Sequence, residues 1–85
     1  MITVELFGVP RLRAGMGQLT LAATTLAAAL GELGRACPAL DGTVIRGGSV
    51  HPAYRVCLND RFVSDPETPL SDGDVLLLLS ADVGG

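Results

Sequence analysis

The fold of this chain is decided by residues 70–79, which read LSDGDVLLLL. Asp72-Gly73-Asp74 is typical of a tight turn, because aspartate bonds the local backbone and glycine tolerates a positive φ. The five apolar residues that follow, 75–79, do not alternate with polar residues. This indicates a strand that is apolar on both faces and lies in the centre of a sheet. One face must pack against a helix, and the other is either hidden by the curl of the sheet or forms an exposed apolar patch that meets a partner.

Two hairpins are predicted before this strand. Residues 2–6 and 19–21 alternate apolar and polar side chains, as strands with one buried face do. The residues between them, 8–18, indicate a break followed by a turn in a loose connection. Residues 54–63 indicate a second hairpin, in which Asn59-Asp60 forms the tight turn.

One helix is predicted between the two hairpins. Thr24 or Thr25 is a suitable N-cap, and Pro38 cannot continue the helical hydrogen bonds. Four residues between them fall on one side of a helix and are expected to be core: Leu26, Leu30, Leu33 and Cys37. Residues 38–52 hold several glycines and prolines and are interpreted as a loop, either a passive connector or a contact for a partner.

The order of these elements predicts an α+β fold of the β-grasp type, a mixed four- to five-stranded sheet wrapped around one main helix. The last strand must lie beside the first, which it reaches through a helical crossover. A ferredoxin-like fold would need a second helix, and none is predicted. We expect a single domain over residues 1–85, with a flexible C-terminal tail at 80–85.

Composition limits the classes of partner. The formal net charge is −3, so we expect no nucleic-acid binding, which needs a surplus of cations to displace counterions from phosphates. The longest apolar run, 75–79, is far too short to span a membrane. No cationic region followed by an apolar stretch opens the sequence, so no export signal is predicted and we expect a cytoplasmic protein.

The side chains do not form a recognisable catalytic or metal-binding motif. Cys37 and Cys57 lack the spacing of a zinc site and are expected to be reduced, partly buried thiols. A Cys–His pair with His51, the one histidine, stays open as an alternative. Turn chemistry explains Asp72 and Asp74. We therefore expect no metal, no bound cofactor and no autonomous activity.

The remaining reactive group is the carboxylate of Gly85. Gly84 and Gly85 have no side chain, so this end can pass through a channel too narrow for other residues. A tail of this kind suits a protein whose end is delivered into another protein's active site. The alternative is that the two glycines are incidental, since glycine accounts for 11 of the 85 residues.

Together these features resemble the ubiquitin-like sulfur carrier family of the MoaD/ThiS type. The resemblance covers essentially the whole chain and rests on Asp72-Gly73-Asp74, the apolar strand, a short spacer and Val83-Gly84-Gly85, with Leu58-Asn59 and Leu70 also matching. It implies a β-grasp fold and a terminal carboxylate that is adenylated by an ATP-using enzyme of the ubiquitin-activating type. Sulfide or a persulfide then displaces AMP and leaves a thiocarboxylate.

The resemblance also implies roles for the residues of the tail. Gly85 would carry the sulfur, and Gly84 would let the backbone pass closely through a narrow site. Ala81, Asp82 and Val83 would form the stalk between the strand and the two glycines.

A docking surface is expected beside the tail. Leu77 and Leu79 on the exposed side of the last strand, with Phe7 on the opposite face of the first strand from its buried residues, would present an apolar patch to a partner. Acidic residues near the tail are expected to steer it toward a basic channel.

Within the family, the chain is closest to the small subunit of molybdopterin synthase, with the large subunit as the sulfur acceptor. Its length, the helix that ends before a proline and the long loop before Tyr54 support this interpretation. Ser80-Ala81-Asp82 stands where that branch commonly has a proline pair, so carriers for thiamine thiazole, cysteine, tRNA thiolation or a thio-metabolite stay as alternatives. A protein-conjugating or protein-binding β-grasp module is the alternative of another class.

Overall fold

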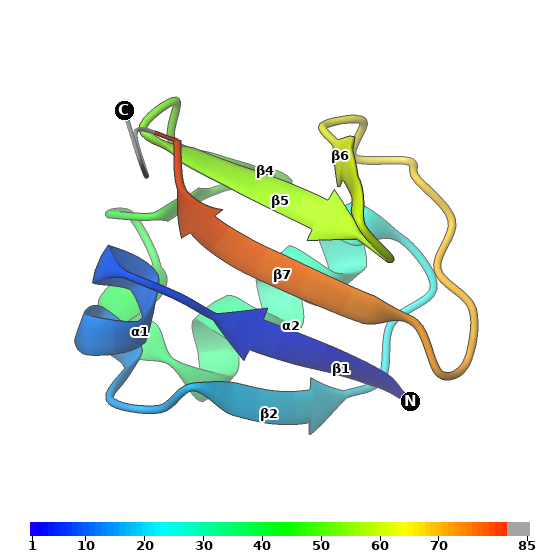
Figure 1. Cartoon of the computed structure of the whole chain (residues 1–85), viewed down its shortest axis with the longest axis horizontal. Coiled ribbons are helices and arrows are strands. Elements are labelled where there is room, and N and C mark those ends of the chain that lie inside the picture. Colours follow the sequence, from blue (N-terminus) through cyan, green and yellow to red (C-terminus); the bar gives the residue numbers. More distant parts are fainter. Residues whose placement is uncertain (82–85) are drawn as a thin grey trace.

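A five-stranded sheet forms the main layer of the computed structural model, which describes residues 1–81 (Figure 1). Its strands are β1 (Ile2–Leu6), β2 (Gln18–Leu21), β5 (Tyr54–Leu58), β6 (Arg61–Val63) and β7 (Val75–Ser80), in the order β2-β1-β7-β5-β6. β7 runs parallel to β1, with Val4 opposite Leu76, and antiparallel to β5, with Val56 opposite Leu78. The prediction that the final strand is central is confirmed.

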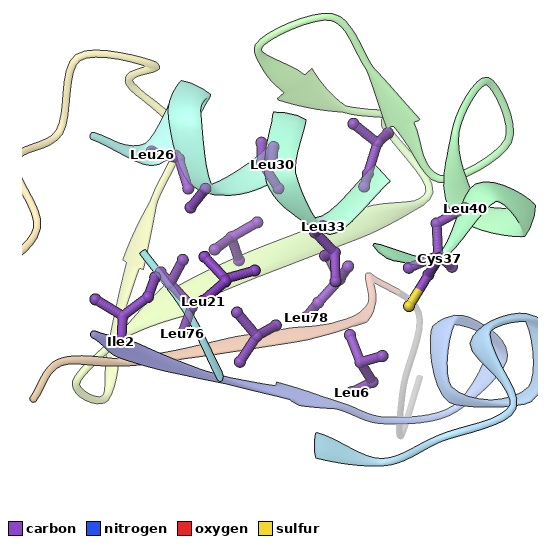
Figure 2. Packing of buried hydrophobic residues seen from close by; sticks show 14 of the residues in the cluster. Ile2, Leu6, Leu21, Leu26, Leu30, Leu33, Cys37, Leu40, Leu76 and Leu78 are labelled. Carbon is purple, nitrogen blue, oxygen red and sulfur yellow. The ribbon is translucent and has the colours of Figure 1, made fainter. Parts of the chain in front are cut away.

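The main helix, α2 (Leu26–Ala36), covers one face of this sheet (Figure 2). It begins after Thr25, whose side-chain oxygen accepts a hydrogen bond from the amide of Ala28 at 3.2 Å, so Thr25 rather than Thr24 is the N-cap. One main helix against a mixed sheet of five strands is the predicted β-grasp arrangement. No helix within residues 1–81 is long and apolar enough to cross a bilayer.

The core lies between α2 and the sheet. Figure 2 shows the leucines of α2 on one side and Leu6, Leu76 and Leu78 of the strands on the other. The predicted stripe of the helix is buried in full, and Cys37, directly after the helix, is buried with it. Burial of a leucine stabilises a fold by roughly 1.5–3 kcal/mol relative to exposure. Side chains alternate along a strand, so the residues of β7 that do not face α2 point to the opposite face.

The segment between β1 and β2 differs from its predicted turn. Residues 9–14 form a short helix, α1 (Val9–Ala14), with a proline in its first turn and Gly15 as its C-cap at φ 73°. The amide of Gly15 donates a hydrogen bond to the carbonyl of Arg11, which closes the last turn. Proline at the start of a helix and a left-handed glycine at its end are both helix signals, and the turn prediction was wrong because it weighed the two residue types only as breakers.

The predicted loop at 38–52 is also more ordered than expected. It holds a 3-10 turn, η1 (Pro38–Leu40), and a two-stranded hairpin of β3 (Ile45–Arg46) and β4 (Ser49–Val50). Leu40, Val44 and Ile45 are buried and complete one end of the core. Two-residue strands are too short to show an alternating pattern, so the sequence alone did not predict them.

The second predicted hairpin is confirmed. Leu58 pairs with Arg61, so Asn59 and Asp60 make a two-residue connection between β5 and β6. Their φ angles are 47° and 74°. Positive φ at both central residues is what the tightest hairpin turn requires, and asparagine and aspartate tolerate it better than other side chains.

Truncation of the core side of α2 tests this packing. Leu33→Ala removes a side chain that is 1% exposed, and we expect it to lower the free energy of unfolding by about 2–5 kcal/mol in urea denaturation. Leu12→Ala is the matched control, because Leu12 on α1 is 81% exposed and its loss should change stability by less than about 0.5 kcal/mol. Equal effects of the two substitutions would contradict the assignment of the core.

Candidate functional site

The end of β7 is the root from which the predicted tail leaves the fold. The amide of Ala81 donates a hydrogen bond to the carbonyl of Ala53 at 2.7 Å, and the amide of Phe7 donates to the carbonyl of Leu78 at 3.0 Å. Both sides of the root are therefore tied to neighbouring chain segments. Ala81, the first predicted stalk residue, is exposed. The other predicted tail residues, Asp82, Val83, Gly84 and Gly85, lie outside the residues that the structure describes.

The connection between β1 and α1 packs directly against this root. Gly8 has a φ of 65°, and a Cβ atom built there would lie 3.4 Å from the side-chain oxygen of Ser80. Glycine permits both the backbone conformation and the close approach. The start of α1 is thus held beside the last residue of β7.

The face of the sheet opposite α2 carries a row of side chains across four strands. Leu77 of β7 lies between Glu5 of β1 on one side and Cys57 of β5 on the other. Cys57 in turn lies opposite Phe62 of β6. These side chains line a shallow hollow of about 500 Å³, together with Asn59, Asp60 and Val75. The outer face is thus partly open and apolar in its middle.

The three predicted docking residues lie near one another on this side. Leu77 and Leu79 are half-buried on the outer face, whereas Leu76 and Leu78 between them are buried under α2. Phe7 is 48% exposed and follows directly after β1, with its amide bonded to the neighbouring strand β7. The register puts Phe7 beside Leu79 at the root, with Leu77 two residues earlier on the same face, and the role of all three as partner contacts stays a prediction.

One aromatic residue of this face was missed by the sequence reasoning. Phe62 is 63% exposed, and the guanidinium carbon of Arg55 lies 5.2 Å from the centre of its ring, in the range of a cation–π contact. The pairing of Cys57 with Phe62 in a two-residue hairpin puts both on one face. The turn at Asn59-Asp60 was therefore the signal that could have found Phe62.

The described acidic residues of the last segment, Asp72 and Asp74, do not lie near the root. Asp72 and Asp74 precede β7, and a strand of six residues separates them from the root by about 20 Å. Asp74 fixes the start of the strand: one of its carboxylate oxygens accepts from the amide of Ser71 at 2.8 Å, and the other accepts from the side-chain amide of Asn59 at 2.9 Å. The Asn59 side-chain oxygen in turn accepts from the amide of Val75 at 3.0 Å.

These bonds lower the pKa of Asp74. The hydrogen bond from the Ser71 amide is the largest cause and the one from Asn59 the second, because both favour the charged carboxylate. The Asp-Gly-Asp turn is therefore a structural lock that joins the start of β7 to the turn between β5 and β6, as turn chemistry predicts.

The two thiols are not arranged as nucleophiles. Burial raises the pKa of Cys37, and burial followed by the nearby Asp60 carboxylate raises the pKa of Cys57 against the opposing effect of Arg55. The Nδ1 atom of His51 accepts from the amide of Ala53 at 2.9 Å. Within residues 1–81 neither cysteine is disulfide-bonded, and neither forms a hydrogen bond with His51.

The comparisons with known proteins identify the family. The model of the ThiS family matches residues 4–85, which is nearly the whole chain and includes the two final glycines. The chain belongs to the ThiS family. This assignment confirms the resemblance to ubiquitin-like sulfur carriers, and no curated protein sequence matches the chain closely.

Solved structures agree with this assignment. SAMP1 from Haloferax volcanii is 25% identical, with a TM-score of 0.85 over 99% of this chain and 98% of that chain. Subunit 1 in the complex of subunits 1 and 2 of the molybdopterin-converting factor from Helicobacter pylori is also 25% identical, with a TM-score of 0.69 over 99% and 97%. The Amycolatopsis orientalis BexX/CysO complex gives 0.84 at 21% identity over both full chains, which supports the fold alone.

The Asp74 lock of this ThiS-family chain predicts a dependence of stability on pH. A carboxyl whose pKa is lower in the folded state stabilises the fold above its ordinary pKa of about 3.9, and this contribution is lost as the pH falls through the lower folded-state pKa. Asp74→Ala should therefore lower the melting temperature at neutral pH, with a difference from the unaltered chain that shrinks in acid. Glu67→Ala, which removes an exposed carboxylate from the preceding loop, is the control. A difference that stays constant from neutral pH into acid would contradict the lock.

The different burial of the two cysteines leads us to predict the order in which they are alkylated. In the native ThiS-family chain, Cys57 should react with iodoacetamide before Cys37, since the first is half-buried and the second is buried. Both should react more slowly at neutral pH than a free thiol, because a raised pKa leaves less thiolate. The site of labelling is read by peptide mass mapping, and early labelling of Cys37 in the folded chain would contradict this order.

Proposed function

We propose that this chain carries sulfur as a thiocarboxylate on Gly85 and donates it to molybdopterin synthase, in the cytoplasm. The observation that carries the proposal is the family match, which runs through the two final glycines. The fold supports it, because β7 is paired on both sides and its end holds the root of the tail at a fixed place.

The chemistry takes place in partner enzymes. A carboxylate is a poor acyl electrophile, so an adenylating enzyme first joins the Gly85 carboxylate to the α-phosphate of ATP and releases pyrophosphate. Sulfide then attacks the carbonyl carbon of this mixed anhydride, the bond to AMP breaks, and the thiocarboxylate remains. ATP is thus used by the partner, and this chain supplies the acyl group and the surface by which it is recognised.

The outer face and the tail have separate tasks in this proposal. Leu77, Leu79 and Phe7 contact the partner and hold the carrier body against it. Gly84 lets the backbone enter a narrow channel, while the stalk of residues 81–83 spans the distance from the root. Binding energy from the body then positions the reacting carboxylate, as remote contacts do for enzyme substrates.

The choice of acceptor rests on the sequence and one neighbour. The length and the loop before Tyr54 resemble the small subunit of molybdopterin synthase, and the molybdopterin-converting factor of Helicobacter pylori is a complex of such a subunit with a second one. A second candidate function is protein modification. It is favoured by the likeness to SAMP1, because the Methanosarcina acetivorans form of that protein, 24% identical, is a small archaeal modifier protein.

Intact-mass spectrometry tests the carrier function. With the cognate adenylating enzyme and ATP, the chain should gain one AMP, and after addition of sulfide it should instead show the replacement of one oxygen atom by sulfur. Deletion of Gly85 should abolish both changes while the circular-dichroism spectrum stays that of the folded chain. Gly8→Ala is not a suitable control because Gly8 has a positive φ, so Ala28→Ser on the exposed side of α2 serves as the neutral variant.

A sulfur-transfer assay identifies the enzyme that accepts the sulfur. The thiocarboxylated chain should lose its sulfur when mixed with the large subunit of molybdopterin synthase and its substrate, but not with thiazole synthase or cysteine synthase. Transfer only to one of the latter would contradict the acceptor assignment and keep the carrier function. An isopeptide bond to another protein, with no transfer of sulfur, would favour the modifier function instead.

A further inference from the structure

A short helix that the proposed function does not use carries an unusual surface. Leu12 of α1 is 81% exposed, Val9 one turn earlier is 38% exposed, and Phe7 just before the helix is 48% exposed. Residues three apart share a helix face, so Val9 and Leu12 continue the surface that begins at Phe7. A contiguous apolar surface left open to water is typical of an interaction site.

Two arginines frame this cluster. Arg11 and Arg13 precede and follow Leu12, so their side chains leave the helix on either side of it. A Cβ atom at Gly17 would lie 3.0 Å from the guanidinium carbon of Arg11, which shows that this side chain lies along the connection to β2. We call Val9, Leu12 and the two arginines the α1 patch, which adjoins Phe7 of the outer face.

Within residues 1–81, neither arginine of the α1 patch forms an ion pair. The helix itself has no acidic residue, and the two elements that pack most against it, η1 and β7, have no charged side chain at all. Asp41, which follows η1, has its side chain beside Gly34 of α2. In a chain of net charge −3, this corner is cationic although the protein as a whole is anionic.

The α1 patch lies close to the root of the tail, where a partner that binds the tail would also contact it. Gly8 joins β1 to the helix and lies so close to Ser80 that a Cβ atom there would contact its side-chain oxygen, so the patch begins next to the root of the tail (Figure 1). Leu79 lies beside the root on the outer face of the sheet. The helix α1 lies on the other side of the root, where it packs against η1 and β7. A partner that takes the tail into a channel therefore has an apolar surface on each side of the root.

We infer that the α1 patch is a second docking element, which contacts an acidic surface around an apolar notch on the sulfur-accepting synthase subunit. This inference rests on the proposed function. Leu12 fills the notch, and Arg11 and Arg13 pair with carboxylates at its rim. The partner's surface is acidic because charge complementarity at a rim steers encounter and selects the partner. Contacts on both sides of the root also fix the direction in which the tail leaves the body.

Binding of the thiocarboxylated chain to the large subunit of molybdopterin synthase tests the inference. The thiocarboxylate is made by thiolysis of an intein fusion, so that the test does not depend on the adenylating enzyme, and affinity is measured by titration calorimetry. We expect Leu12→Ala to weaken binding about five- to tenfold, as loss of an interface anchor does. Arg11→Glu and Arg13→Glu should each weaken it about tenfold at low ionic strength, with a smaller effect at high salt.

Arg61→Glu is the matched control for charge. Arg61 is exposed on the edge strand β6, away from the root, and its reversal changes the net charge by the same amount. It should change the affinity less than about twofold. The variants of the α1 patch should keep the circular-dichroism spectrum of the folded chain, because all three side chains are exposed.

The outcomes separate this inference from the proposed function. Binding by the unaltered chain with no loss in any variant of the α1 patch would overturn the inference alone. Failure of the unaltered chain to bind the subunit would overturn the inference together with the acceptor assignment, whereas the carrier function is tested separately by intact mass. Self-association of the chain that Leu12→Ala abolishes, or binding to an RNA oligonucleotide that the arginine reversals abolish, would also overturn the inference, since it would give the patch a different occupant.

Discussion

The structure depends on the pairing of β7 on both of its edges. A parallel partner on one side and an antiparallel partner on the other satisfy its backbone groups and fix its register in both directions. A shift of one residue would turn Leu76 and Leu78 out of the core and move the apolar side chains of the outer face inward. The register therefore sets at once what α2 packs against, what the outer face presents and where the chain leaves the sheet.

Each part of this strand has a different task. Its start is locked by the Asp74 and Asn59 side chains, which join it to the turn of the neighbouring hairpin. Its middle supplies core leucines to one face and half-buried leucines to the other. Its end is the root of the tail, held by the backbone bonds of Ala81 and Phe7. The proposed carrier function needs a rigid body, and the pairing of this central strand on both edges provides one up to the root.

Most of this framework could be predicted from local sequence. The leucine stripe, the turn at Asn59-Asp60 and the unbroken apolar run each have a short-range physical cause, and all three are confirmed.

The helix α1 was missed because six residues give less than two full turns of periodicity, so that its proline and Gly15 were taken as breakers. The β3–β4 hairpin was missed because strands of two residues are too short to show an alternating pattern. How exposed the outer face of the sheet is depends on which side chains lie opposite one another on neighbouring strands. This pairing follows from the strand register, which the sequence alone does not give. The reactive end at Gly85 was predicted from residue chemistry and family resemblance, and its residues lie outside those that the structure describes.

The central claim is that partner enzymes recognise the tail only on its folded body, through the surfaces beside the root. ATP–pyrophosphate exchange by the cognate adenylating enzyme tests this most directly, with the full chain compared with a synthetic peptide of residues 76–85. We predict that the full chain supports exchange with a kcat/KM at least about a thousandfold higher, since the peptide keeps the glycines and loses the contacts of the body that position the carboxylate. Exchange at a similar kcat/KM with the peptide would contradict it, because the fold would then contribute nothing to recognition.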